Sequence, residues 1–318
     1  MKYYLEFEEP IKIIDEEIHL KESFLDKSSE LSKELAILYE KRLKLINKIH
    51  SGLNRWQKVQ LARHPGRPYA LDYINFIFSE FFEVHGDRLF ADDPAVVTGF
   101  AKIRDKKIAI IAQQKGRNTK ENLFRNFGMM KPEGYRKALR VMKLAEKFKL
   151  PVITLMDTPG AFPGIGAEER GQGEAIAKNL IEMSSLKVPI ISVVIGEGAS
   201  GGALGIGVCD KFFMMQNSWY SVISPEGCAS ILFRDASKAE EAAEALKVTP
   251  DDMVDMGICD LIISEPNGGA HRDSESSAKN LQSVLLESLG ELNTIDPGTF
   301  IDKRIEKYDA LGVFEEGK

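Results

Sequence analysis

One local pattern occurs twice in this 318-residue sequence and constrains its fold more than any other feature. The first copy is an apolar run that follows Leu150-Pro151 and ends in Asp157-Thr158-Pro159-Gly160. The second follows Val188-Pro189 and ends in Gly196-Glu197-Gly198. In both copies the glycine-rich segment leads into a stretch with helical periodicity. A strand, a glycine loop and a helix in succession form the unit of α/β folds, whose ligands bind where the strands end.

Other short apolar runs predict more strands of the same sheet. The predicted strands are residues 107–113, 152–156, 190–195, 211–215 and 261–264, and the predicted helices are 133–149, 168–185 and 238–246. Because the strands are almost entirely apolar, helices must cover both faces of the sheet. The sequence therefore predicts an α/β domain.

The first 64 residues have a different character. They are charged, almost free of glycine, and carry apolar residues such as Leu31, Leu35 and Leu38 at helical spacing. Two prolines and a glycine in residues 63–68 end this pattern. We expect a helical arm over residues 1–64, a main domain over 65–293, and a tail over 294–318 that is either exposed or a docking helix.

Composition excludes several classes of protein. With Lys+Arg 42 against Asp+Glu 48, the net charge of −6 argues against a surface built to bind nucleic acid. The three cysteines, Cys209, Cys228 and Cys259, form no metal-binding pair, so we expect buried reduced thiols and no metal site. The N-terminus lacks an apolar signal segment, and the run 188–195 is too short to span a membrane, so we expect a cytoplasmic protein.

The glycine cluster of residues 196–203 matches two well-known motifs. Gly196, Gly198 and Gly201 have the spacing of a dinucleotide-binding loop, but the acidic residue expected about 20 positions later is missing. Gly198-x-Ser200-x-Gly202 has the spacing of a nucleophile elbow. Asp260 and His271 follow in the order that a serine hydrolase needs, so hydrolysis through Ser200 stays an alternative.

A third interpretation uses the backbone alone. Gly201 and Gly202 lie side by side at a predicted helix start, where their N–H groups carry no Cβ obstruction. Two such N–H groups can form an oxyanion hole for an enolate or a polarised carbonyl. This chemistry needs no side-chain triad. By contrast, the Asp157–Gly160 resemblance to a GTPase motif fails because the chain has no phosphate-binding loop.

Several ordered motifs together resemble the α subunit family of the acetyl-coenzyme A carboxylase carboxyltransferases. The motifs are residues 63–69 (RHPGRPY), 71–74 (LDYI), 83–88 (EVHGDR), 114–117 (QKGR), 126–129 (NFGM), 156–161 (MDTPGA), 198–203 (GASGGA) and 223–227 (ISPEG). The resemblance implies a crotonase-like (ClpP/crotonase) fold, an α/β ββα spiral superhelix with an N-terminal helical extension. The family domain is expected to begin near residue 35.

The resemblance also implies an activity and partners. The carboxyl group of carboxybiotin, carried on the separate biotin carboxyl carrier protein, would pass to acetyl-CoA and give malonyl-CoA for fatty acid synthesis. We expect a carboxyltransferase β subunit in an α2β2 assembly, a biotin carboxylase that binds ATP elsewhere in the complex, and no cofactor bound covalently to this chain. Since carboxybiotin can supply its own base, the chain needs no catalytic histidine.

The resemblance assigns roles to particular residues. Gly201 and Gly202 would hold the biotin ureido oxygen, with Gly160, Gly164, Gly166, Gly198 and Ser200 shaping the cavity. Residues 115–149 carry 11 basic and 3 acidic side chains, which could meet CoA phosphates or an acidic carrier, or could be a solvated helix face. Lys115, Arg117 and Arg125 are the favoured anion-binding residues. A stand-alone acyl-CoA hydratase or isomerase is a further alternative, with Glu168 or Glu226 as its base.

Overall fold

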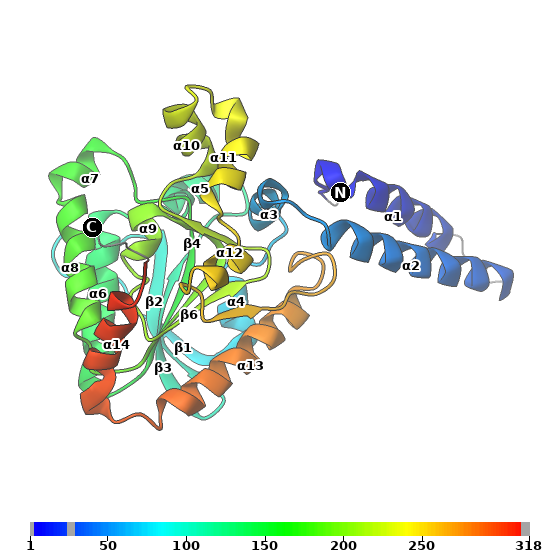
Figure 1. The fold of residues 1–318 in the computed structure, drawn as a ribbon. Helices are drawn as coiled ribbons and strands as arrows, with labels where there is room; N and C mark the ends of the chain where they lie inside the picture. The colour runs from blue at the N-terminus through cyan, green and yellow to red at the C-terminus, as the bar shows by residue number, and fades with distance from the viewer. Residues whose placement is uncertain (1–2, 24–28, 313–318) are drawn as a thin grey trace, which may run out of the picture.

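The computed structural model describes residues 3–23 and 29–312. Residues 1, 2 and 24–28 of the expected arm, and 313–318 of the expected tail, lie outside the described residues. One eight-stranded sheet forms the centre of the molecule (Figure 1). Its strands are β1 (Ser79–Glu83), β2 (Val96–Ile103), β3 (Lys106–Gln113), β4 (Val152–Thr158), β5 (Ile190–Ala199), β6 (Lys211–Met215), β7 (Trp219–Ser221) and β8 (Leu261–Ile263).

The sheet is mixed, with the order β1-β2-β3-β4-β5-β6-β8 and with β7 paired to β5. The pairs β1/β2 and β2/β3 are antiparallel, whereas β3 to β6, β8 and β7 run parallel. The five predicted strands are confirmed as β3, β4, β5, β6 and β8. In the parallel part, strand ends that carry glycine loops meet at one edge of the sheet.

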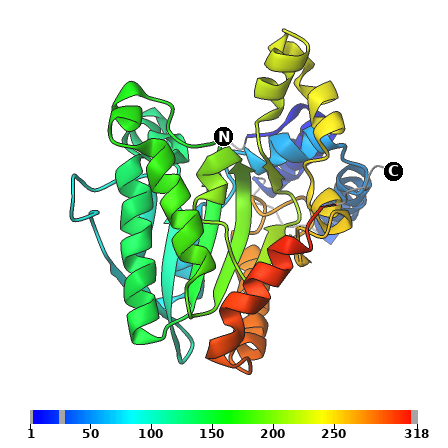
Figure 2. The ribbon, with the colours of Figure 1, turned by 60° about the vertical axis from the view of Figure 1, so that its left-hand side comes forward.

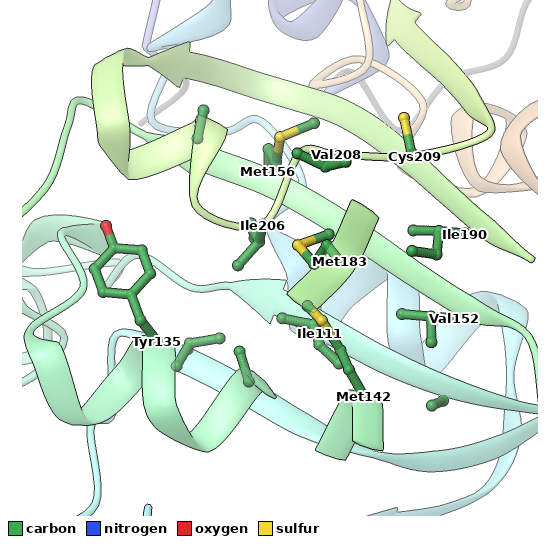
Figure 3. Close-up of a cluster of buried hydrophobic side chains, with 14 of the residues drawn as sticks. Ile111, Tyr135, Met142, Val152, Met156, Met183, Ile190, Ile206, Val208 and Cys209 are labelled. Carbon is green, nitrogen blue, oxygen red and sulfur yellow. The ribbon is translucent and has the colours of Figure 1, made fainter. Parts of the chain in front are cut away.

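Helices cover both faces of the sheet, as the apolar strands predicted. Ala109 and Ile111 pack toward α6 (Pro132–Phe148) and α8 (Gln172–Ser184), in the cluster that Figure 3 shows. Ile108 and Ile110 point to the opposite face, which α4 (Ala70–Ile77) and α13 (Ser274–Leu292) cover. This alternation along β3 is the two-residue period of a strand. All three cysteines are buried and unpaired, as expected.

The predicted helices are confirmed with one exception. The segment 168–185 is two helices, α7 (Ile165–Glu169) and α8, separated at Gly171, whose φ of 80° lies in the left-handed region. The predicted helices 133–149 and 238–246 are α6 and α11 (Ala239–Leu246). The short helices α5 (Thr119–Phe124), α9 (Ser200–Leu204), α10 (Pro225–Leu232) and α12 (Pro250–Asp255) complete the main body.

The N-terminal helices form a projecting hairpin. The helices α1 (Glu9–Glu22) and α2 (Ser29–His50) pack on one another through Ile14, Ile18 and Leu38 and extend away from the sheet (Figure 1). In contrast, α3 (Arg55–Ala62) packs on the main body, where Val59 and Ala62 contact the buried ring of Trp219. The described part of the first 64 residues thus includes both a projecting segment and a segment of the core.

The chain ends on a docking helix. The helix α14 (Phe300–Asp309), red in Figure 2, contacts α8 through the fully buried side chain of Arg304. Its guanidinium donates to the carbonyl oxygens of Met183, Leu186 and Val188 and pairs with Asp210. No helix in residues 3–23 or 29–312 is long and apolar enough to cross a membrane.

Candidate active site

The two glycine loops meet at the edge of the sheet where β4 and β5 end. The first runs from Asp157 to Gly160, and the second joins β5 to α9 at Ser200. Gly202 lies directly against Gly160: a Cβ added to Gly202 would lie 2.3 Å from the Gly160 carbonyl carbon. The loops are therefore in backbone contact, and only glycine at position 202 allows this approach.

The start of α9 presents backbone N–H groups at this edge. The first turn of any helix has N–H groups without an intrahelical acceptor, and Gly201 and Gly202 lie in that turn. Ser200 enters the helix with a φ of 57°, a left-handed conformation that costs a non-glycine residue energy and is frequent at functional sites. Gly201 is half-buried and Ser200 is exposed, so the N–H groups lie at the molecular surface. Two adjacent amides of this kind can stabilise an oxyanion.

A buried chain of charges lies behind the loops. Lys115 Nζ lies 2.6 Å from Asp157 Oδ1 and 2.7 Å from Glu197 Oε1, which joins the ends of β3, β4 and β5. Glu197 also pairs with Arg63, which continues to Glu226 at the start of α10. Burial alone would raise the pKa of Glu197, but the charges of Lys115 and Arg63 lower it below its usual range. The ion chain therefore favours the ionised form of Glu197.

A small cavity of about 280 Å³ opens beside the first loop. It lies between Arg63, Tyr69, Lys115 and Pro159, and the ring of Phe127 forms part of its wall. Phe127 is 45% exposed and has a φ of 56°, so the chain holds an aromatic ring at the surface in an unfavourable backbone conformation. In the sequence Phe127 was indicated only as a member of the motif 126–129 (NFGM), with no role assigned to it.

The other predicted cavity glycines have different positions. Gly164 precedes α7 and Gly166 lies within it. Gly198 is a residue of β5, and a Cβ there would lie 2.6 Å from the Tyr220 ring. Gly196 also lies in β5 rather than in a phosphate-binding loop. The packing of β5 accounts for both strand glycines, which removes the dinucleotide interpretation.

The three favoured cations have internal partners. Besides the ion pairs of Lys115, Arg117 donates to the carbonyl oxygens of Pro65 and Arg67, pairs with Asp72 and stacks on Tyr69. Arg125 donates to the carbonyl of Pro94 at 2.8 Å. These groups hold the loops around the site and are not free anion-binding charges in this conformation.

Much of the remaining basic stretch is also neutralised internally. On α6, Arg136 pairs with Asp87, Lys137 with Asp92, and Lys143 with Glu182. Arg140 donates to the carbonyl oxygens of His85 and Gly86. Part of the positive charge in residues 115–149 thus binds α6 to segment 85–93 and to α8, and these side chains are not free to bind a phosphate in this conformation.

The residues of the hydrolase alternative do not come together. Asp260 accepts the Phe212 N–H and pairs with Lys307 of α14. His271 stacks on His64 and faces Glu8 at the base of the arm. Because each has partners away from Ser200, the described structure contains no triad of these residues, and the serine hydrolase alternative is not favoured. Of the two alternative bases, Glu226 pairs with Arg63 and Glu168 lies on the exposed side of α7.

One cluster has metal-ligand residue types, namely Glu8, His64 and His271. The imidazole rings of His64 and His271 are stacked with centroids 3.9 Å apart and planes at 28°. A metal ion must lie in the plane of each coordinating imidazole, and stacked planes do not converge on one ion. His64 also uses both nitrogens in the protein, accepting from Gly66 N–H and contacting the Tyr3 carbonyl. The cluster therefore fits a structural role.

Sequence comparisons identify the relatives of this chain. A family described as acetyl co-enzyme A carboxylase carboxyltransferase-like matches residues 4–312, a range that includes α1 and α2. The acetyl-coenzyme A carboxylase carboxyl transferase subunit alpha of Chlorobaculum parvum is 54% identical over 332 residues, which cover 100% of this chain and 99% of that protein. The protein of the same name from Fusobacterium nucleatum is 52% identical, with coverage of 98% and 99%.

Structural comparisons agree on the fold. The 12S transcarboxylase with methylmalonyl-coenzyme A bound aligns with 67% of this chain and 41% of its own, at a TM-score of 0.54 and 24% identity. A Pseudomonas malonate decarboxylase hetero-tetramer with coenzyme A aligns with 67% of this chain and 85% of its own, at a TM-score of 0.56 and 15% identity. These likenesses confirm the predicted crotonase-like α/β fold. With relatives above 50% identity along the whole sequence, the predicted carboxyl transferase class is confirmed as well, and the chain belongs to the acetyl-coenzyme A carboxylase carboxyltransferase family.

Proposed function

We propose that this chain is the α subunit of an acetyl-CoA carboxylase carboxyltransferase, which transfers the carboxyl group of carboxybiotin to acetyl-CoA and forms malonyl-CoA. The names of its full-length relatives support this assignment. In this proposal the N–H groups of Gly201 and Gly202 hold the ureido oxygen of biotin and stabilise negative charge there. The observation that carries the assignment is the contact of Gly202 with Gly160, which brings both glycine loops to one point of the surface.

The proposed role fits the side chains around the loops. Carboxybiotin, arriving on a separate carrier protein, supplies the activated carboxyl group, so this chain has to bind and orient rather than provide a nucleophile. The loop-edge cations and carboxylates are paired with one another, which leaves backbone donors as the groups that face the ligand. In this proposal Gly160, Gly164 and Gly166 shape the floor of the ligand site, and Phe127 and Tyr69 line the neighbouring cavity beside the first loop.

The exposed position of the glycine pair suits a site completed by another subunit. Exposed apolar side chains lie on the helices near it: Ile165 on α7, Ile181 on α8 and Leu204 on α9. Apolar side chains that stay exposed on several neighbouring elements mark surfaces for protein association. We assign this surface to a carboxyltransferase β subunit in an α2β2 complex, which also works with a biotin carboxyl carrier protein and a biotin carboxylase. The cytoplasmic location stays a prediction.

The test uses the complex reconstituted with its β subunit. Gly201→Val should abolish malonyl-CoA formation, because a branched Cβ blocks the approach of an oxygen to the N–H groups. The fold should tolerate it, since an added Cβ at Gly201 meets only Ile176 Cδ1, at 3.4 Å. Gly173→Val on α8, where a Cβ meets nothing within 4 Å, is the matched control. Full activity of an assembled Gly201→Val complex would contradict the proposed site.

A second measurement separates the proposal from the stand-alone enzyme. The purified chain is incubated without a β subunit with a series of acyl-CoA substrates. We expect no turnover until the β subunit and carboxybiotin are added. Hydration, isomerisation or hydrolysis by the chain alone would overturn the carboxyltransferase assignment.

A further inference from the structure

Gln113 is the last residue of β3, and its side chain is fully buried. Its amide makes two hydrogen bonds to the backbone in opposite directions, and its Nε2 also contacts Met130 Sδ at 3.3 Å. Oε1 accepts from the Asp157 N–H at 3.1 Å, and Nε2 donates to the Gly202 carbonyl oxygen at 2.7 Å. One side chain thus joins the end of β3 to the first residue of one glycine loop and to the helical turn that follows the other.

The bond from Gln113 gives the Gly202 carbonyl a donor that α9 does not provide. In a longer helix this carbonyl would accept from the Ile206 N–H, four residues later. The helix α9 has only five residues, and the Ile206 N–H donates to the Ala203 carbonyl instead, at 3.1 Å. The Gly202 carbonyl takes its partner from Gln113, which lies 89 residues earlier in the chain. A short helix with few internal bonds is easily rotated, and its N–H directions rotate with it.

The same bond fixes the contact between the two loops. Gly202 lies against Gly160 with no room for a Cβ, and Gly160 follows Asp157 by three residues. Gln113 holds Asp157 on one side and Gly202 on the other, so it determines how the loops lie against one another. An oxyanion hole works only when its donors point at the position of the developing charge.

We propose that Gln113 is a positioning residue for carboxyl transfer, which orients the Gly201 and Gly202 N–H groups by holding the Gly202 carbonyl. This rests on the proposed function of the glycine pair. Gln113 itself need not touch the substrate. Its loss should therefore lower kcat more than it raises KM for acetyl-CoA, because the substrate still binds while its charge is held less well.

The neighbouring residue provides a matched control. Gln114 is also a buried glutamine whose amide makes two bonds, from the Leu71 N–H at 2.8 Å and to the Lys115 carbonyl at 2.7 Å. It therefore contributes similarly to stability, but neither bond reaches a glycine loop. Gln113→Leu and Gln114→Leu each remove a buried side-chain amide that bonds one backbone N–H and one backbone carbonyl.

The experiment measures kcat, KM and thermal unfolding of the reconstituted complex for both variants. We expect Gln113→Leu to lose about 10- to 100-fold in kcat, while Gln114→Leu keeps kcat within about twofold at a similar melting temperature. Equal kcat losses in the two variants, or none in Gln113→Leu, would overturn the proposal. If the wild-type complex makes no malonyl-CoA, it is the proposed function that is wrong. The Gln113 proposal by itself fails only when the wild-type complex is active and the two variants do not differ.

Gln113→Glu adds a readout that a purely structural role would not give, and it serves if Gln113→Leu does not fold. A protonated carboxyl group has one O–H donor and one carbonyl acceptor, so it can make both bonds of the amide. The ionised form has no donor for the Gly202 carbonyl. We expect kcat relative to wild type to fall as pH rises, or to stay at a low value at every pH if the group is ionised throughout. A kcat relative to wild type that rises with pH would contradict the inference, because the form that lacks the donor would then be the more active one.

Discussion

At the scale of single residues, the two adjacent glycines have different physical roles. An alanine methyl at Gly202 would lie 2.3 Å from the Gly160 carbonyl carbon, so the backbone of one loop has to move. At Gly201 the nearest atom is Ile176 Cδ1 at 3.4 Å, an ordinary contact. Position 202 needs glycine because the backbone of Gly160 lies directly against it. Position 201 has room for a Cβ, so its glycine is explained by the access of a ligand to the backbone N–H groups.

This difference predicts separate effects on stability. We expect Gly202→Ala to lower the free energy of unfolding by about 1–3 kcal/mol, the usual effect of overpacking, and Gly201→Ala to leave it nearly unchanged. Thermal unfolding of the two variants measures this. Gly173→Ala, at an exposed helical site with nothing within 4 Å, should stabilise by about 0.5–1 kcal/mol through helix propensity. A Gly202→Ala variant as stable as wild type would show that the loops are not in rigid contact.

The buried ion chain predicts that the stability of the protein depends on the balance of charge between Lys115 and its two carboxylate partners. Lys115→Met leaves the carboxylates of Asp157 and Glu197 without their shared cation, and breaking a buried pair costs about 3–5 kcal/mol. Lys115→Met combined with Asp157→Asn removes one positive and one negative charge, so we expect it to recover a large part of that loss. Denaturant unfolding of the single and double variants tests the balance. A double variant less stable than Lys115→Met alone would contradict it.

Sequence reasoning found the glycine pair but not the residues that hold it. Two adjacent glycines after an apolar run are a local signal. The bonds of Gln113 and Lys115 join positions 42 to 89 residues apart, and no local pattern shows which strand ends will be neighbours. For the same reason Lys115, Arg117 and Arg125 looked like free cations, although Lys115 and Arg117 form ion pairs in the fold and Arg125 donates to the carbonyl of Pro94.

At the scale of elements, the predictions were reliable where a segment is buried on both faces. The strands β3 to β6 lie inside the sheet and show as continuous apolar runs. The strands β1 and β2 were missed because glutamate, lysine and glycine interrupt them, and β7 because Trp219-Tyr220-Ser221 is not a continuous aliphatic run like that of β8. The division of α7 from α8 depends on the left-handed conformation of Gly171, which a helical pattern alone does not show.

The last helix depends on one side chain. Arg304 is fully buried and donates to three carbonyl groups in the segment that ends α8, besides pairing with Asp210. Arg304→Met leaves these acceptors without a donor, so we expect faster hydrogen exchange in α14 and at the end of α8, and a stability loss of about 3 kcal/mol or more. Lys303→Met, at an exposed position one residue earlier, is the control and should change exchange little. Equal exchange in the two variants would show that α14 docks without Arg304.

At the scale of the whole molecule, the arm and the body meet at one buried charge. Glu8 is fully buried, and its Oε1 lies 3.2 Å from Arg272 Nη2, 3.5 Å from His271 Nε2 and 3.7 Å from His50 Nε2. Burial alone would raise the pKa of Glu8, but the nearby imidazoles of His271 and His50 and the hydrogen bond from the Leu5 N–H bring it well below its usual range. His64 stacks on His271, and burial together with the charge of His271 lowers the pKa of His64 to about 4.

Because of these pKa shifts, we expect the docking of the arm on the body to weaken as the pH falls. A histidine whose pKa is lowered in the fold favours the neutral form, so its contribution is present above the ordinary value near 6.5 and is lost as pH falls toward about 4. Burial also lowers the pKa of His271, and the lowered pKa of Glu8 acts in the same sense below about 4.5. We expect α1 to lose hydrogen-exchange protection, corrected for intrinsic rates, between pH 7 and pH 5, while β3 to β5 keep theirs.

A variant without the two stacked rings, which leaves His50 in place, tests the cause. In His64→Gln combined with His271→Gln, the protection of α1 should change clearly less between pH 7 and pH 5 than in the wild-type chain, whatever its absolute level. Glu8→Gln should weaken docking at both pH values, because Arg272 then lies in the junction without its anionic partner. The glycine loops lie at the carboxyl ends of β4 and β5 rather than at this junction, so carboxyl transfer at pH 7 should survive the double histidine substitution. Undiminished protection of α1 in the wild-type chain at pH 5 would mean that the apolar contacts of the arm, not the charges around Glu8, hold it to the body.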